Sequence, residues 1–134
     1  MNLLVIDVGT SSIRAAIVRP GAGVTVSRHH PLLPDSPAPG LVEFDARAMA
    51  EAVLDLGRAV LAEGGPVDAV GITNQRASAV VWDRATGEPV GPGIGWQDLR
   101  TVIDCLTLGA QGVRLAPNLT ATKAAHLLDL ADPD

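Results

Sequence analysis

Three apolar runs separated by short polar turns occupy the first thirty residues of the chain. Residues 3–8, 13–18 and 24–30 each have the length and composition of a β-strand. A Gly-Thr-Ser-Ser turn at 9–12 separates the first two runs, and a Pro-Gly-Ala-Gly turn at 20–23 separates the second two. Because strands joined by such short turns run antiparallel, the pattern predicts a three-stranded meander.

The period of the apolar positions then changes to that of a helix. After a loop at 31–40 that contains four prolines, Asp45 is a candidate N-cap, and a Gly-Gly-Pro sequence at 64–66 ends the predicted helix. One helical face carries Met49, Ala52, Val53, Leu56 and Val60. Residues 67–73 are mainly apolar, which predicts a fourth strand buried on both faces. A helix between two such strands is a crossover, so we expect the fourth strand to run parallel to the first.

The second half of the chain is less regular. Residues 78–83 and 90–96 flank a polar turn at 84–89, which predicts a hairpin. Asp98 is a candidate cap for a short helix, and Thr120 begins a last helix. The expected apolar positions of these two helices are Val102, Ile103 and Leu106, and then Ala124, Leu127, Leu128 and Ala131. No internal repeat or linker is visible, so we expect a single domain.

The expected order of elements is therefore β-β-β-α-β, followed by a hairpin and two further helices. This is an α/β chain with a mixed sheet. Three antiparallel strands followed by a parallel crossover form the beginning of the ribonuclease H-like fold of the actin-like ATPases, here in incomplete form.

Composition narrows the classes of partner. The chain has a net charge of −5, which argues against nucleic acid, since binding to phosphate backbones needs a basic face. No apolar run approaches the ~18 residues of a membrane span, and no basic segment precedes the first apolar run as in a signal peptide. A single cysteine, Cys105, excludes an internal disulfide and fits a reducing compartment, so we expect a cytoplasmic protein. The three histidines and this cysteine have no metal-ligand spacing.

The end of the first strand carries the first candidate chemistry. Asp7 closes the apolar run, and the turn after it contains Gly9, Thr10, Ser11 and Ser12. A carboxylate beside backbone N–H and hydroxyl donors suits a metal-bound polyphosphate, and glycine lets the backbone approach a phosphate closely. All of these residues are also turn formers, so a plain hairpin turn explains them equally well. No Walker A sequence and no dinucleotide-binding glycine pattern is present.

The second candidate site follows the fourth strand. Asn74, Gln75 and Arg76 bring hydrogen-bond donors and acceptors to the strand end where α/β sheets bind ligands, an inventory that suits a polyhydroxylated substrate. Further on, the face of Trp96 and the carboxylate of Asp98 suit a polyol as well. A polar loop, a core tryptophan and an N-cap aspartate explain the same residues without any ligand.

Four motifs, which follow one another along the chain, resemble those of a known protein family. Residues 7–12 (DVGTSS), 71–76 (GITNQR), 81–89 (VWDRATGEP) and 96–101 (WQDLRT) resemble the amino-terminal part of the FGGY carbohydrate kinases, and among them most closely the glycerol kinases. Residues 120–123 (TATK) are similar to the start of a later helix in that family. The resemblance runs from residue 3 to about residue 130.

The resemblance implies ATP-dependent phosphoryl transfer to a hydroxyl of a sugar or polyol. It places Asp7 at Mg²⁺ and assigns the ATP side to Asp7, Gly9, Thr10, Ser11, Ser12 and Arg14. It assigns the substrate side to Gln75, Arg76, Trp96 and Asp98. The family's catalytic base comes later than the matched stretches, so we expect no catalytic residue within this chain.

Two departures from the family pattern matter. Glycerol kinases resemble Asn-Gln-Arg-Glu at 74–77, and this chain has Ala77 where the glutamate would stand. Another polyol or a ketose therefore stays open beside glycerol, although the Gly-Gln-x-His that is typical of xylulose kinases is absent too.

The second departure is length. Family members carry a second domain that completes the ATP site, so residues 1–134 are expected to be a partial amino-terminal domain without activity of its own. Expected partners are a sugar or polyol and either a carboxy-terminal half or a second copy of the chain in a homo-oligomer. An inactive actin-like module used for binding or scaffolding stays open as the alternative. A chaperone-type or activator-type ATPase is disfavoured, because such proteins need no hydroxyl pocket.

Overall fold

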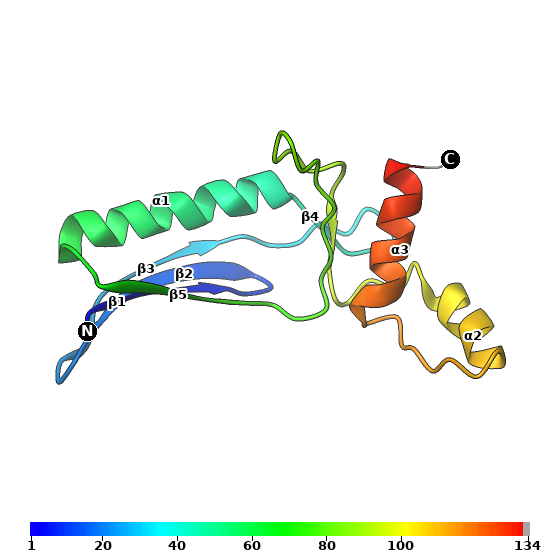
Figure 1. Ribbon diagram of the computed structural model, residues 1–134, viewed down its shortest axis with the longest axis horizontal. Coiled ribbons are helices and arrows are strands. Elements are labelled where there is room, and N and C mark those ends of the chain that lie inside the picture. Colours follow the sequence, from blue (N-terminus) through cyan, green and yellow to red (C-terminus); the bar gives the residue numbers. More distant parts are fainter. Residues whose placement is uncertain (133–134) are drawn as a thin grey trace. The chain divides into compact units, whose positions relative to one another are not determined.

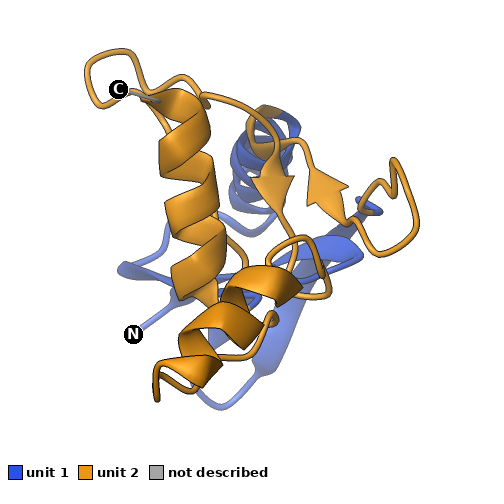
Figure 2. Cartoon of the chain, turned by 90° about the vertical axis from the view of Figure 1, so that its right-hand side faces the viewer, with its two compact units in different colours: residues 1–33, 48–75 blue, residues 34–47, 76–134 orange. Residues whose placement is uncertain are grey.

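A computed structural model describes residues 1–132 of the chain. Its helices and strands, labelled in Figure 1, are β1 (Leu3–Val8), β2 (Ser12–Arg19), β3 (Gly23–Pro31), β4 (Glu43–Phe44), α1 (Ala46–Gly64), β5 (Ala69–Asn74), β6 (Gly93–Ile94), α2 (Val102–Ala110) and α3 (Thr120–Ala131). The chain forms two compact units, one from residues 1–33 and 48–75 and the other from 34–47 and the described residues from 76 on (Figure 2). None of the described helices is both long and apolar enough to cross a lipid bilayer.

The first unit is built on a four-stranded mixed sheet. Its strand order is β3-β2-β1-β5, with β1 antiparallel to β2, β2 antiparallel to β3, and β1 parallel to β5. The predicted meander and the predicted parallel crossover are both confirmed. This mixed sheet with its crossover helix is the start of the actin-like, ribonuclease H-like fold.

Helix α1 covers one face of this sheet (Figure 1). Alternate residues of β1 and β2 point toward it and are buried, and they are Leu4, Ile6, Val8, Ile13, Ala15 and Ile17. The predicted apolar face of α1 packs against them through Met49, Ala52, Val53, Leu56 and Val60. Asp45 precedes the helix, and its Oδ1 accepts a hydrogen bond from the Arg47 amide at 2.9 Å, as expected of an N-cap. The core is aliphatic.

Shortening a side chain in this core is expected to cost stability. Ile17 is fully buried against α1, so Ile17→Val should lower the free energy of unfolding by about 0.5–1.5 kcal/mol, measured by urea denaturation. Val24→Ala is the control, because Val24 is exposed and its truncation should change the free energy of unfolding by less than about 0.5 kcal/mol. Equal losses for the two variants would contradict this description of the core.

The burial predicted for the fourth strand is wrong. All six residues of β5 are exposed, including the apolar side chains of Val70 and Ile72. The reason is position, because β5 is an edge strand of the sheet and the apolar face of α1 packs over β1 and β2 instead. An apolar sequence predicted the strand correctly, but it did not predict the neighbours needed to cover it.

The second unit contains a short sheet that the sequence did not reveal. Strand β4 pairs antiparallel with β6, and Glu43 also pairs with Asp35 in the proline-rich loop. The predicted hairpin exists as isolated bridges between Ala79 and Ile94 and between Trp82 and Pro89. Strands of two residues are too short to give a periodic pattern, which explains why β4 was missed.

The two final helices differ from expectation in their ends and faces. Helix α2 begins at Val102 with Thr101 before it, so Asp98 lies too early in the chain to cap it. In α3 the buried residues are Thr122, Lys123 and Leu127, whereas Leu128 is 55% exposed. The packed face of α3 therefore includes two polar side chains, which a search for apolar positions does not find.

Candidate functional site

The turn between β1 and β2 is held by backbone hydrogen bonds. The Gly9 amide donates to the Ser12 carbonyl at 3.0 Å, and the Leu32 amide donates to the Ser11 carbonyl at 3.0 Å. A Cβ on Gly9 would lie 3.0 Å from the Ser12 oxygen, so a side chain here would crowd the backbone of the turn. The structure thus confirms the tight turn. That its N–H groups and hydroxyls bind a phosphate stays a prediction.

Asp7 lies in a row of polar residues on the sheet face opposite α1. The register places Arg14 of β2 on one side of Asp7 and Thr73 of β5 on the other, and His29 of β3 lies beyond Arg14. Cross-strand neighbours in register share a face, and the buried partners of α1 occupy the other one. Asp7 therefore has a neighbouring cation and an open surface around it.

The pair between Asp7 and Arg14 is exposed. The Arg14 guanidinium lies 3.5 Å from Asp7 Oδ2, and the Arg14 and Asp7 side chains are 66% and 43% exposed. Exposed pairs of this kind contribute at most about 1 kcal/mol, so a divalent cation can compete for the carboxylate. No group of three or more metal-ligating His, Cys, Asp or Glu side chains occurs within residues 1–132. Mg²⁺ fits a single acid of this kind, because it usually binds through one or two carboxylates together with waters and substrate phosphates.

The loop after β5 meets the end of β1. Val8 is in register with Asn74, and the Gln75 amide donates to the Val8 carbonyl at 2.8 Å. The carboxyl ends of the two parallel strands therefore bring Asp7 and Gln75 to the same edge of the sheet. Asn74 lies there too, with its Nδ2 3.3 Å from the Gln75 carbonyl. The sequence named it as a candidate beside Gln75 and Arg76, and it is the last residue of β5.

The remaining predicted substrate residues belong to the second unit. Arg76 is exposed, and Ala77 after it adopts a left-handed backbone with φ of 63°. Trp96 is 41% exposed, so it is not the core tryptophan that was the alternative explanation without a ligand. The side-chain oxygen of Gln97, next to it, is buried without a hydrogen-bond partner in the described chain.

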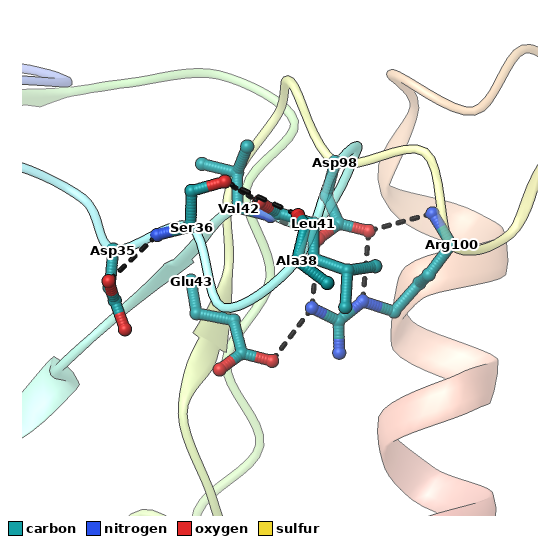
Figure 3. A network of polar contacts seen from close by, with 8 residues as sticks. All are labelled: Asp35, Ser36, Ala38, Leu41, Val42, Glu43, Asp98 and Arg100. Atoms are coloured by element: carbon teal, nitrogen blue, oxygen red, sulfur yellow. Dashed lines mark hydrogen bonds and ion pairs between the residues drawn. The ribbon is translucent and has the colours of Figure 1, made fainter.

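Asp98 is fully buried in a network of ion pairs and hydrogen bonds (Figure 3). Its Oδ1 accepts from the Arg100 amide and Nε at 2.9 Å each, and its Oδ2 accepts from the Val42 amide at 2.6 Å and Arg100 Nη2 at 2.8 Å. Arg100 Nη2 also lies 2.8 Å from Glu43. Burial opposes ionisation of Asp98, but the hydrogen bonds from Arg100 and Val42 outweigh it and hold the pKa of the carboxyl below its usual value.

This network leaves Asp98 little capacity for a ligand. Each carboxylate oxygen already accepts two hydrogen bonds from the protein, which fills the four lone-pair positions of the group. Asp98 ties the segment after Trp96 to β4 through Arg100 and Glu43. The geometry thus favours a supporting position for Asp98 over direct contact with a substrate.

The fold and the site together define a class of protein. The fold is that of the actin-like ATPases, with an acid at the end of β1 and a polar loop after the parallel strand. Residues 2–120 match the N-terminal domain of the FGGY family of carbohydrate kinases, and the chain belongs to this family.

Relatives of known activity extend the match. The chain is 39% identical to glycerol kinases from Rhodospirillum centenum and Xanthobacter autotrophicus over 95% of its own length. It spans 28% of the length of each of these relatives. Among solved structures, a Plasmodium falciparum glycerol kinase with ADP has a TM-score of 0.84 and 22% identity, over 98% of this chain and 29% of that one. A xyloylose kinase from Brucella ovis has a TM-score of 0.81 and 25% identity, over 92% and 28% of the two chains.

Proposed function

We propose that this chain forms the substrate-side part of an ATP-dependent kinase that phosphorylates a hydroxyl of a sugar or polyol. The observation that carries the proposal is the parallel register of β1 and β5, which brings Asp7 and the Gln75 loop to one edge of the sheet. An acid for a metal and a loop rich in donors and acceptors are then neighbours, as phosphoryl transfer to a hydroxyl requires.

Each group has a separate task in this proposal. Asp7 binds Mg²⁺, which neutralises charge on the ATP phosphates when it is bound, and the turn from Gly9 to Ser12 donates hydrogen bonds to those phosphates. Arg14, next to Asp7 in register, adds positive charge beside the transferred phosphoryl group. On the substrate side, Gln75 and Arg76 bind hydroxyls and Trp96 packs along the carbon chain. Asp98 supports the segment that carries Trp96, through its contacts with Arg100.

The chain is proposed to need a partner for turnover. No residue of this chain is assigned as the general base, so residues 1–134 alone should show no phosphorylation of any polyol above the background with ATP and Mg²⁺. A coupled ADP-release assay on the purified chain measures this, and turnover that depends on Asp7 would overturn it. The missing groups come from a carboxy-terminal part or from another chain in the cytoplasm, where ATP is abundant.

The substrate class rests on two opposing observations. The glycerol kinases at 39% identity favour glycerol. Ala77 removes a carboxylate acceptor from the proposed pocket, and an unpaired buried hydroxyl costs about 1–3 kcal/mol, or roughly 5- to 150-fold in affinity. A longer polyol or a ketose, whose additional hydroxyls find other acceptors, is the second candidate.

A fusion enzyme tests the proposal. Residues 1–134 replace the matching segment of the Rhodospirillum centenum glycerol kinase, and the product is assayed with glycerol, longer polyols and ketoses such as xylulose. We expect ATP-dependent phosphorylation of at least one of them. Ala77→Glu should shift the preference toward glycerol if the lost carboxylate sets the specificity. A folded fusion enzyme that binds ATP but phosphorylates none of them would contradict the proposed function and favour a scaffold.

A further inference from the structure

The only lysine in the sequence is a buried one. Lys123 of α3 has an exposed fraction of 0%, and its Nζ donates to the carbonyls of Ala77 at 3.2 Å and Leu119 at 3.3 Å. Burial lowers its pKa, while the charge of Asp98 acts in the opposite direction. A buried ammonium is unfavourable unless its donors are used, so Lys123 depends on these two carbonyl contacts.

One of these two carbonyls belongs to Ala77, which is far from Lys123 in the sequence and has an unusual backbone conformation. Within residues 1–132, Ala77 is the non-glycine residue with positive φ, at 63°. That region crowds the Cβ against the backbone and is unfavourable for alanine. The hydroxyl of Ser78 is buried without a hydrogen-bond partner in the described chain, so it does not hold this segment in place. Lys123 is the side chain seen to do so, through the Ala77 carbonyl.

The backbone conformation of Ala77 affects Arg76, the residue before it. Ala79 exchanges two backbone hydrogen bonds of 2.9 Å each with Ile94, which fixes the chain shortly after Ala77. The direction of the chain between Arg76 and Ala79 then depends on the φ of Ala77. A change of that angle turns the peptide that carries Arg76 and re-aims its guanidinium.

We propose that Lys123 is a positioning residue for substrate binding, which holds Ala77 in the left-handed conformation and thereby aims Arg76 at the substrate hydroxyls. This inference rests on the proposed function for the role of Arg76. The effect of Lys123 on the backbone of Ala77 can be tested without the proposed function, because the contact between these residues does not depend on any activity. Lys123 itself touches no substrate in this account.

The variants separate this role from ordinary packing. Lys123→Met removes the ammonium and keeps an unbranched stem. Leu127→Ala is the matched control, because Leu127 is buried one turn along the same helix and packs against Ala79 and Ile94. Ala77→Gly removes the Cβ that makes positive φ unfavourable, so a glycine at this position should keep the conformation with less help from Lys123.

The backbone readout uses the 134-residue chain alone. In Lys123→Met we expect NMR couplings and NOEs to show that Ala77 leaves positive φ, and amide exchange at residues 76–78 to rise at least ~10-fold. Leu127→Ala should lower the melting temperature without either change. An unchanged φ and unchanged exchange in Lys123→Met would overturn the proposal. If Lys123→Met does not fold, the double variant Lys123→Met with Ala77→Gly is tested instead. A double variant that folds supports the proposal, and a double variant that does not fold refutes it.

The binding readout uses the fusion enzyme. Lys123→Met should raise KM for the polyol at least ~10-fold while kcat stays within ~3-fold and KM for ATP is unchanged, and adding Ala77→Gly should restore KM to within ~3-fold of the parent. If Lys123→Met lowered kcat alone, or if Ala77→Gly did not restore KM, Lys123 would not be a positioning residue. If the parent fusion enzyme is inactive, the proposed function fails, and the NMR result still decides the contact between Lys123 and Ala77.

Discussion

Asp7→Asn in the fusion enzyme is expected to lower kcat/KM by at least ~100-fold, the largest effect on activity that the structure predicts. The amide has nearly the same shape as the carboxylate but no charge, so it binds Mg²⁺ far more weakly. The exposed pair with Arg14 contributes little to folding, which means that the melting temperature should hardly change. Initial rates over a range of Mg²⁺ concentrations measure the effect.

The control for this variant is another exposed aspartate in an ion pair. Asp55 lies 3.3 Å from Arg58 on α1, and the Arg58 and Asp55 side chains are 73% and 77% exposed. Asp55→Asn should leave kcat/KM within ~2-fold of the parent. If the fusion enzyme with Asp7→Asn kept its activity, the proposal that Asp7 binds the metal would be wrong.

Asp98→Asn is expected to lower the free energy of unfolding of the 134-residue chain by about 3–5 kcal/mol, the largest effect on stability. The substitution removes the charge that two buried partners face, because Asp98 accepts hydrogen bonds from Arg100 and from the Val42 amide. Arg100 is then left mostly buried with Glu43 as its remaining carboxylate. Urea denaturation measures the change, and Asp55→Asn should cost less than about 1 kcal/mol.

The same network predicts a dependence of stability on pH. The pKa of Asp98 is lowered in the folded chain, so its contribution to stability is present above the unfolded value near 3.8 and is lost as the pH falls through the lower folded value. The gap in stability between the parent and Asp98→Asn should therefore close as the pH falls below 3.8. A small and pH-independent gap would mean that Asp98 is free to bind substrate and is not a structural group.

Much of the first unit could be predicted from the sequence, because its signals are local. The turn at 9–12 and the apolar period of α1 set the meander and the crossover, and both are confirmed. The position of Asp7 at the end of β1, at the same edge as Gln75, follows from those elements. The turn and the helix are each set by residues that lie close together in the sequence.

What the sequence did not predict depends on contacts between distant residues. The exposure of β5 depends on which neighbours cover an edge strand, and an apolar run carries no information about them. The burial of Lys123 and the network of Asp98 depend on contacts 46 and 56 residues away, with Ala77 and Val42. A lysine and an aspartate in polar stretches give no sign of such burial.

A titration with Mn²⁺ shows whether the acid at the end of β1 binds a divalent metal where β1 and β5 end side by side. This ion takes the same oxygen ligands as Mg²⁺ and, being paramagnetic, broadens the NMR signals of nearby amides. Titrated into the labelled 134-residue chain with ADP, it should broaden residues 7–12 and 74–75 in the parent and leave them sharp in Asp7→Asn. Equal broadening in both proteins, or broadening confined to the exposed acids of α1, would contradict the account.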